Sequence, residues 1–409
     1  MLELAVDCPC KTPTMVRCRK FSVSIIALFV LVALKIYMDL TYTSPQLSDE
    51  PTIIYGPHRS PLAHLEPLRY DEELSMTALH NLAQKLRDNL ATSDAFWNTA
   101  QLQLLNLKGS MAWTCNFTSA LTVKGTASYP GLLQSFLVHS QCRNNRILIN
   151  QPKKCSVNST FLLLAIKSSP QNFAQRQAVR DSWGIERNYG GRNVRLVFLL
   201  GTIPAPDLSP LLAHENSRYH DLLQWDFVDT FFNLTLKDQL FLGWAKQYCA
   251  GAKYILKGDD DVFARTPRIV HVLSLLDSHR HDSLYMGHIV KSAKPYRDPH
   301  SKYYIPPSFY TGVYPPYAGG GGYVFSGSLT PWLYLVSQFV VPFPIDDVYT
   351  GMCFMVLGVH PVGHPGFKTF NVPKEDKNGC SEKHLLLVHQ KSPQEMLKMW
   401  SHREETQQC

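Results

Sequence analysis

Short runs of apolar residues alternate with helical patterns between residues 161 and 261, and this alternation limits the fold more than any other feature. The apolar runs occupy residues 161–166, 194–200, 222–225 and 254–256, and helical spacing occupies 172–183 and 236–244. Short continuous apolar runs are typical of strands buried on both faces. The order predicts an α/β domain with a mostly parallel sheet, in which ligands bind at the carboxyl ends of the strands.

The composition agrees with a large folded domain. Apolar residues make up 45% of the 409 residues and charged residues 18%, which excludes an intrinsically disordered chain. The net charge is +7, from 40 basic and 33 acidic residues, and the excess is spread along the chain. The composition therefore predicts no nucleic-acid partner.

An apolar segment near the N-terminus predicts a membrane anchor. Four basic residues lie within residues 1–20, residues 21–34 carry no charge, and Lys35 alone interrupts the run before Asp39. As a helix, residues 21–38 would span about 27 Å, close to the thickness of a thin bilayer. The positive-inside rule places residues 1–20 in the cytosol and the remainder in the lumen, as in a single-pass type II protein. A cleaved signal peptide is the alternative, but no small-x-small cleavage site follows the run.

Residues 39–114 are predicted to form a lumenal stem, because prolines interrupt the first half and only residues 76–90 have helical spacing. The dense, domain-like part of the chain is predicted to cover residues 115–409. Seven of the ten cysteines lie there, dispersed and without a close Cys-x-x-Cys pair, which argues against zinc or thioredoxin chemistry. They suit an oxidising lumen and about three disulfides. The cysteine left over and the apolar stem helix are compatible with a homodimer or heterodimer.

Three N-glycosylation sequons follow the anchor, and their asparagines are predicted glycosylation sites: Asn116, Asn158 and Asn233. A single triplet of this kind arises readily by chance. The position of all three after the anchor supports a lumenal domain.

Three consecutive acids, Asp259, Asp260 and Asp261, follow the apolar run that ends at Leu256. Adjacent carboxylates repel, so a divalent cation that prefers oxygen ligands would stabilise them, and a diphosphate would complete its coordination. Alternate residues of an extended segment point to opposite sides, so Asp259 and Asp261 share one side. The alternative is a solvated turn or a helix N-cap, and the position after a strand favours the metal site.

Two further acids, Asp346 and Asp347, lie between Pro344 and a predicted helix from Val348. Either acid suits a helix N-cap. In the other interpretation, one of them is a general base that removes a proton from an acceptor hydroxyl, while the other caps the helix.

Four consecutive glycines within residues 314–327 are flanked by Tyr317 and Tyr323. Glycines let a backbone approach a ligand closely, and the flat tyrosine rings suit sugar rings. A P-loop is excluded because the GxxxxGK[ST] pattern is absent. The alternative is a flexible hairpin.

Basic side chains form the last group of candidates. Arg176 and Arg180 lie one helical turn apart, where they would grip a phosphate or form a solvated basic face. His389 ends the apolar run LLLVH, where a lone histidine is more often a core residue than a ligand. Lys237 and Asp229 are likewise either core residues or ligands.

The strings RQAVRDSWG, VFLLG, DFVDTFFNLTLK, KGDDDVF, YYIP, YPPYAGGGG, PIDDVYTGMC and LLLVHQK occur in this order. Together they resemble the β-1,3-glycosyltransferases of glycosyltransferase family 31, and most closely the β-1,3-N-acetylglucosaminyltransferases that extend poly-N-acetyllactosamine. The resemblance covers about residues 115–409. The related galactosyltransferases tend to have Glu-Asp where this chain has Asp346 and Asp347.

The resemblance implies a GT-A fold, which is an α/β domain with a Rossmann-like mixed sheet, behind the anchor and stem. It implies a UDP-sugar donor, a Mn²⁺ or Mg²⁺ ion held by Asp261, Asp259 and His389, and Asp347 as the catalytic base with Asp346 in reserve. Residues on the donor side would be Lys167, Arg176, Arg180, Asp260, Gly319, Gly320 and Gly321. Tyr317 and Tyr323 would shape the acceptor pocket.

The activity implied is inverting transfer of N-acetylglucosamine from UDP-GlcNAc to the 3-hydroxyl of a terminal β-galactose, in a single displacement at the Golgi membrane. The acceptor would be a glycan on a glycoprotein or glycolipid. The alternatives are a β-1,3-galactosyltransferase that uses UDP-galactose, and an inactive lumenal partner of a related transferase.

Overall fold

The computed structural model of the 409-residue chain describes residues 84, 87–91, 93–106, 128–140, 142, 145–156, 159–276, 283–369 and 384–402. The predicted cytosolic tail, the anchor at 21–38, most of the stem, and the sequons at Asn116 and Asn158 lie outside these residues. Within the described ranges, no helix is long and apolar enough to cross a membrane.

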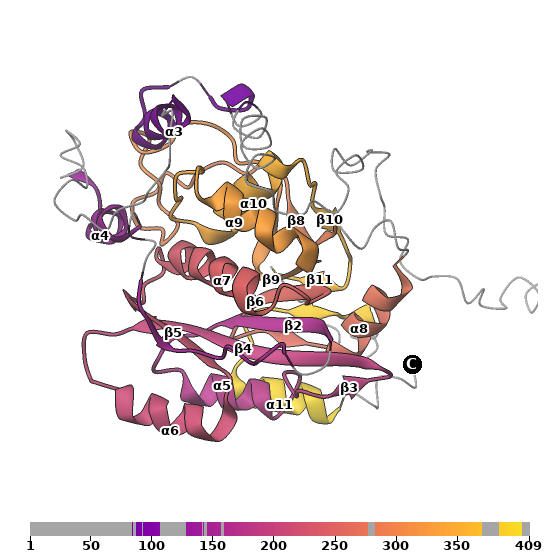
Figure 1. The fold of residues 1–409 in the computed structure, drawn as a ribbon. Coiled ribbons are helices and arrows are strands. Elements are labelled where there is room, and N and C mark those ends of the chain that lie inside the picture. The colour runs from indigo at the N-terminus through magenta and orange to yellow at the C-terminus, as the bar shows by residue number, and fades with distance from the viewer. Residues whose placement is uncertain are drawn as a thin grey trace, which may run out of the picture. The chain divides into compact units, whose positions relative to one another are not determined.

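A nine-stranded mixed sheet forms the centre of the domain (Figure 1). Its strands are β1 (Ile147–Ile149), β2 (Thr160–Lys167), β3 (Asn188–Tyr189), β4 (Arg192–Thr202), β5 (Leu222–Val228), β6 (Tyr254–Asp259), β8 (Tyr285–Val290), β9 (Tyr317–Ser326) and β10 (Val362–Gly363). Their order is β1-β5-β4-β2-β6-β9-β8-β10, with β3 beside β4. Strands β5, β4, β2 and β6 are parallel neighbours, whereas β9 is antiparallel to both β6 and β8. The α/β class and the four predicted strands are confirmed, and the antiparallel strands make the sheet mixed.

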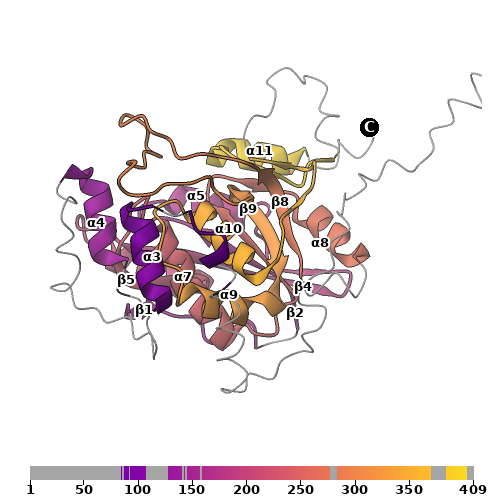
Figure 2. The same ribbon diagram turned by 90° about the horizontal axis from the view of Figure 1, so that it is seen from above.

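The apolar runs form the strands because both faces of the sheet are covered. Every residue from Leu162 to Ile166 in β2 is fully buried, which removes the apolar side chains from water and stabilises each by about 1.5–3 kcal/mol. One face is covered by α5 (Phe173–Arg180), α6 (Ser209–Tyr219), α8 (Thr266–Leu275) and α11 (Pro393–Ser401). The other is covered by α7 (Leu234–Tyr248), α9 (Thr330–Ser337) and α10 (Asp346–Leu357), with α3 (Phe96–Asn106) and α4 (Gly131–His139) on the same side (Figure 2).

Helix α3 falls within the predicted stem but is part of the folded domain. The indole N–H of Trp97 donates to the Val341 carbonyl (3.0 Å), and its ring packs edge-on against Phe343. Gln101 exchanges hydrogen bonds with the backbone carbonyl of Phe339 and the N–H of Val341. The predicted boundary at residue 115 is therefore wrong. The local pattern missed it because the partners of α3 lie about 240 residues further along the chain.

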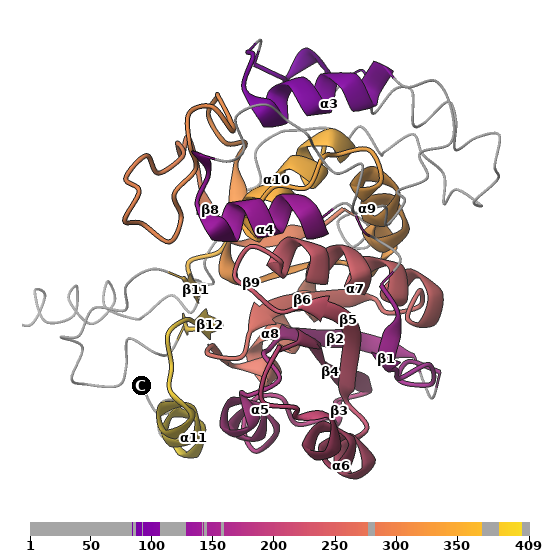
Figure 3. The same ribbon diagram turned by 90° about the vertical axis from the view of Figure 1, so that its left-hand side faces the viewer.

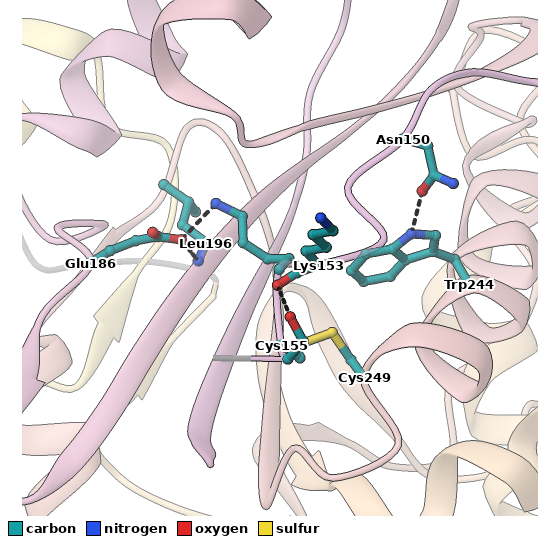
Figure 4. Close-up of a disulfide and its surroundings, with 9 residues drawn as sticks. Asn150, Lys153, Cys155, Glu186, Leu196, Trp244 and Cys249 are labelled. Atoms are coloured by element: carbon teal, nitrogen blue, oxygen red, sulfur yellow. Dashed lines mark hydrogen bonds and ion pairs between the residues drawn. A yellow bond between two sulfur atoms is a disulfide. The ribbon is translucent and has the colours of Figure 1, made fainter. Parts of the chain in front are cut away.

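A disulfide joins Cys155, which precedes β2, to Cys249, which follows α7 (Figure 4). The two Cα atoms are 5.2 Å apart and the sequence separation is 94 residues. A cross-link that closes a loop of this length stabilises a domain by about 4–5 kcal/mol if the gain is entropic. Cys142 is also disulfide-bonded, and Cys353 is buried within α10.

Candidate active site

The parallel strands β2 and β6 end side by side, and their last residues, Lys167 and Asp259, are paired in register. The acid triplet therefore lies at the carboxyl edge of the sheet, as predicted from its position after an apolar run. The three acids do not point to a common place. Asp259 and Asp261 face one group of partners and Asp260 another.

Asp259, Asp261 and His389 converge. A small second sheet, formed by β7 (Phe263–Ala264), β12 (Leu387–Val388) and β11 (Phe367–Lys368), brings His389 from the C-terminal part of the chain to the triplet. One ligand atom from each of the three residues lies within 4.8 Å of the others. The Nε2 atom of His389 is 3.1 Å from Asp261 Oδ1 and 3.8 Å from Asp259 Oδ2.

The donor set fits a divalent cation. Two carboxylates and one imidazole suit Mn²⁺, and carboxylates also suit Mg²⁺. Burial disfavours the charged imidazole, but the hydrogen bond and charge of Asp261 and the charge of Asp259 outweigh it and raise the pKa of His389. Asp259 and Asp261 thus stabilise a positive charge between them, and a bound metal ion would supply such a charge.

Asp260 turns the other way and is buried. Its Oδ2 atom accepts hydrogen bonds from the Ser168 hydroxyl (2.6 Å) and the Asn172 amide (3.0 Å). Burial raises the pKa of Asp260, although these two hydrogen bonds oppose the shift. Asp260 therefore anchors the turn between β2 and α5, and its predicted contact with the donor stays a prediction.

Asp346 and Asp347 form the first turn of α10 but have different surroundings. The Lys167 ammonium donates to Asp346 Oδ2 at 2.5 Å, and both side chains are buried. Asp347 is half-buried and accepts from the backbone N–H groups of Gly320 (3.0 Å) and Val348 (2.8 Å). Asp346 thus belongs to an internal ion pair, while Asp347 is bound to the backbone of β9 and to that of its own helix.

The protonation of Asp347 suits a general base. Burial, followed by the charge of Asp346, raises the pKa of Asp347 to about 7, against the opposing charge of Lys167 and the hydrogen bonds from Gly320 and Val348. A base whose pKa lies near the working pH combines a usable ionised fraction with a strong pull on the proton. Of the two predicted acids, Asp347 therefore fits the base and Asp346 does not.

Lys167 links these two parts of the site. Its ammonium lies 3.0 Å from Asp259 Oδ1 and 2.5 Å from Asp346 Oδ2, and the residue is 4% exposed. Burial would lower the pKa of Lys167, but the surrounding carboxylates raise it well above its usual value. Lys167 is thus the counter-ion of the two carboxylates, and its predicted contact with the donor stays a prediction.

The glycine run lies inside β9, so the flexible hairpin is wrong. A Cβ atom on Gly320 would lie 3.3 Å from Asp347 Oδ2, and one on Gly321 would lie 2.8 Å from His389 Cγ. A Cβ atom on Gly319 would lie 2.9 Å from the Thr369 side chain. These glycines therefore make room for the side chains of the site itself. Their predicted contact with the donor stays a prediction.

The two tyrosines that flank the glycines have different positions. Tyr317 is half-buried, and burial followed by the nearby charge of Asp347 raises its pKa. Tyr323 is 4% exposed, packs edge-on against Tyr285, and donates to the Thr350 hydroxyl at 3.4 Å. The prediction that Tyr323 binds the acceptor is wrong, because the core between β9 and α10 encloses its ring.

Arg176 and Arg180 are also neutralised within the protein. Arg176 is fully buried and forms a two-pronged ion pair with Glu215 at 2.7 and 2.8 Å. Arg180 pairs with Asp221 and with Glu215, each at 2.7 Å. The prediction that these arginines grip a donor phosphate is wrong, because Glu215 of α6 and Asp221, which follows that helix, neutralise them. The nearest link to the site is indirect, since Arg176 also donates to the Ser168 hydroxyl that holds Asp260.

Some residues of this edge were missed or left ambiguous in the sequence. Ser168 and Asn172 hold Asp260, and Lys237 donates to the Ser168 carbonyl (2.6 Å) and to Asp229 (2.9 Å). Lys237 and Asp229 are thus a structural pair. The signal that would have found Ser168 is its place directly after β2, at the carboxyl edge of the parallel strands.

Glycosylation at Asn233 is incompatible with this structure. The side chain is fully buried at the start of α7, and its Nδ2 atom donates to the Val228 carbonyl at 2.8 Å. A glycan is attached to that same nitrogen, so the folded domain leaves no room for it. The prediction for Asn233 is wrong, since the sequon pattern carries no information on burial.

Known proteins are similar to this chain in sequence across these elements. A family profile described as galactosyltransferase matches residues 174–365. The mouse N-acetyllactosaminide β-1,3-N-acetylglucosaminyltransferase 2 is 45% identical over 76% of this chain and 85% of its own length. The mouse UDP-GlcNAc:βGal β-1,3-N-acetylglucosaminyltransferase 8 is 38% identical over 94% of this chain and 98% of its own. The solved structure of WbbM, a bifunctional glycosyltransferase, is similar at 12% identity with a TM-score of 0.35, over 57% of this chain and 46% of that chain. On the sequence matches, the chain belongs to the galactosyltransferase family of that profile, among its β-1,3-N-acetylglucosaminyltransferases.

Proposed function

We propose that the protein is a GT-A glycosyltransferase that moves N-acetylglucosamine from UDP-GlcNAc to the 3-hydroxyl of a terminal β-galactose, with inversion. The observation that carries this proposal is the pairing of two sites at one sheet edge. A cluster of metal-ligand type, Asp259, Asp261 and His389, lies near Asp347, a carboxylate of pKa about 7. Lys167 connects the two, because it bonds to Asp259 of the cluster and to Asp346, the neighbour of Asp347 in the chain. The donor and acceptor named for the mouse relatives complete the assignment.

A Mn²⁺ or Mg²⁺ ion would be held by Asp259, Asp261 and His389. When bound, such an ion supplies positive charge against the leaving diphosphate of UDP. The Lys167 ammonium pairs with both Asp259 and Asp346 next to that position. Gly321 leaves the space that the His389 ring occupies, so the imidazole can approach both carboxylates.

Asp347 would take the proton from the galactose 3-hydroxyl. The new bond joins that oxygen to C1 of N-acetylglucosamine, and the bond from C1 to the diphosphate breaks on the opposite face. The proton passes to Asp347 and UDP leaves with the electron pair. The bonds from Gly320 and Val348 hold the carboxylate in place, so little reorganisation is needed. One displacement inverts the anomeric carbon, so the mechanism needs no carboxylate nucleophile.

The test is transfer from UDP-GlcNAc to N-acetyllactosamine by the purified full-length protein in detergent. Transfer that stops on chelation and returns with Mn²⁺ supports the proposal. Asp347→Asn is expected to lower kcat by about 10²–10⁴-fold and to leave UDP binding intact. A rate near that of the wild type in Asp347→Asn would refute the assignment of the base.

A second candidate is β-1,3-galactosyl transfer from UDP-galactose, because the matching family profile is described as galactosyltransferase. The same assay with UDP-galactose decides between the two donors. Faster transfer of galactose at equal donor concentration would keep the fold and the base and change the donor. Binding of UDP without transfer from either donor would favour the inactive-partner alternative.

We also propose that the chain is a single-pass type II protein of the Golgi membrane, with the domain in the lumen. The support is the charge distribution around residues 21–38 and the cysteines after it. In sealed microsomes, protease should remove only an N-terminal tag, and glycosidase should reduce the mass only through Asn116 and Asn158. Degradation of the C-terminal domain without detergent would contradict this topology.

A further inference from the structure

The segment between β8 and β9, residues 291–316, forms an ordered loop, drawn in orange beside β8 (Figure 3). Arg297 holds the loop together by donating to the carbonyls of Ile305 (2.5 Å) and Tyr310 (2.9 Å). The N–H of Ile305 in turn donates to the Tyr296 carbonyl at 2.9 Å. Side chains on this segment are therefore presented from a fixed backbone.

Three aromatic rings meet where this loop lies against the loop after β5. The rings of Phe231 and Tyr303 are 5.4 Å apart, and those of Tyr303 and Tyr296 are 6.0 Å apart. Tyr296 is 62% exposed and Tyr303 36% exposed. The Lys302 ammonium lies over the faces of Phe231 and Tyr303 at 5.3 and 4.9 Å. We call Phe231, Tyr296 and Tyr303 the aromatic platform. Exposed apolar side chains are usually scattered, so a contiguous group of rings marks a binding surface.

The platform borders the candidate active site through Tyr317. Tyr317 pairs with Val290 at the base of the loop and lies three residues before Gly320, which holds Asp347. Burial, followed by the charge of Asp347, raises the pKa of Tyr317. The loop that carries Tyr296 and Tyr303 begins after Val290 and ends before Tyr317, so both of its ends lie at the Val290–Tyr317 pair.

The other side of the platform lies at the carboxyl edge of the parallel strands. Phe231 sits in the short connection between β5 and α7, two residues after Asp229. Asp229 pairs with Lys237, which also binds the Ser168 carbonyl at the end of β2. The platform is therefore tied to the same edge that carries the rest of the site.

We propose that the aromatic platform binds the sugar residues that follow the terminal galactose of the acceptor, an inference that rests on the proposed function. Pyranose rings have apolar C–H faces that pack on aromatic rings, and tyrosine hydroxyls and a lysine ammonium donate to their oxygens. A sugar chain is favoured over a second copy of the protein because the platform borders the base through Tyr317. The platform makes the enzyme select oligosaccharide acceptors over a single galactose.

The test compares two acceptors that end in the same β-galactose, methyl β-galactoside and a tetrasaccharide of two N-acetyllactosamine units, with the full-length protein and UDP-GlcNAc. Tyr296→Ala and Tyr303→Ala are expected to raise KM for the tetrasaccharide about tenfold. Both should leave KM for methyl β-galactoside and for UDP-GlcNAc unchanged. Tyr296→Phe keeps the ring and loses only the hydroxyl, so it should raise KM for the tetrasaccharide less than Tyr296→Ala does. Leu211→Ala, a change at a residue that is 56% exposed on α6, is the matched control and should have no effect.

Three outcomes would overturn the inference. Equal losses on both acceptors would assign the tyrosines to general packing or to the terminal galactose. An unchanged KM for the tetrasaccharide in both alanine variants would remove the platform from acceptor binding while the proposed function stands. A change in oligomeric mass by light scattering, without a change in KM, would assign the platform to a second copy. Absence of galactoside transfer in the wild type is a different failure, since it removes the proposed function and with it this inference.

Discussion

Transfer is expected to depend on pH through Asp347. The ionised carboxylate is the form that accepts a proton, so the rate follows the ionised fraction. With a pKa of about 7, Asp347 is about half ionised at pH 7 and about one hundredth ionised at pH 5. The rate should therefore fall about fiftyfold between these values. An aspartate with the ordinary pKa of 3.8 would still be about 94% ionised at pH 5, so its rate would barely change.

The assay is the initial rate of transfer to N-acetyllactosamine from pH 5 to 8, at saturating UDP-GlcNAc and Mn²⁺. Donor and metal affinity must be measured at each pH, because protonation of His389 weakens metal binding independently. Asp346→Asn is the informative variant. It removes a charge that raises the pKa of Asp347, so the acid limb should move to lower pH. A flat profile from pH 5 to 7 with donor and metal saturated, or an acid limb that Asp346→Asn leaves in place, would refute this reasoning.

Three further predictions follow from contacts of single residues. Gly321→Ala places a Cβ atom 2.8 Å from His389 Cγ, so the affinity for Mn²⁺, measured by titration, should fall while the domain stays folded by circular dichroism. Lys167→Met leaves the buried Asp346 and the partly exposed Asp259 without their cation, and the free energy of unfolding in denaturant should fall by about 3 kcal/mol, in part restored by Mn²⁺. Asn233→Gln should leave the glycan mass unchanged by mass spectrometry and lower stability, because the buried Asn233 side chain donates to the Val228 carbonyl.

The parts of the fold that were predictable from sequence are those with local patterns. The runs around β2, β4, β5 and β6 are continuous and apolar because both sheet faces are covered, and a one-dimensional pattern records that burial directly. Helix α3 left no such record. Its packing depends on partners such as Val341 that are distant in sequence. A local sequence pattern does not record such contacts, so the predicted domain boundary left α3 out.

The site shows the same division. Asp259 and Asp261 were predictable because they follow an apolar run that forms a parallel strand, and Asp347 was predictable because it lies at the start of a predicted helix. The roles of Arg176 and Tyr323 were not predictable from sequence. Residue type and spacing indicate which groups a side chain is able to contact, but not that Glu215 neutralises Arg176 or that the core encloses Tyr323.

The glycine run couples catalytic competence to folding. Four glycines in a strand cost roughly 2–4 kcal/mol relative to alanine, since each loses more backbone freedom on folding. The volume that their side chains would occupy is filled by Asp347, His389 and Leu387, which arrive from later parts of the chain. The packing around β9 is therefore complete only when Asp347 and His389 lie against its glycines. A chain that has not finished folding holds neither group in place, so immature molecules should be inactive by construction.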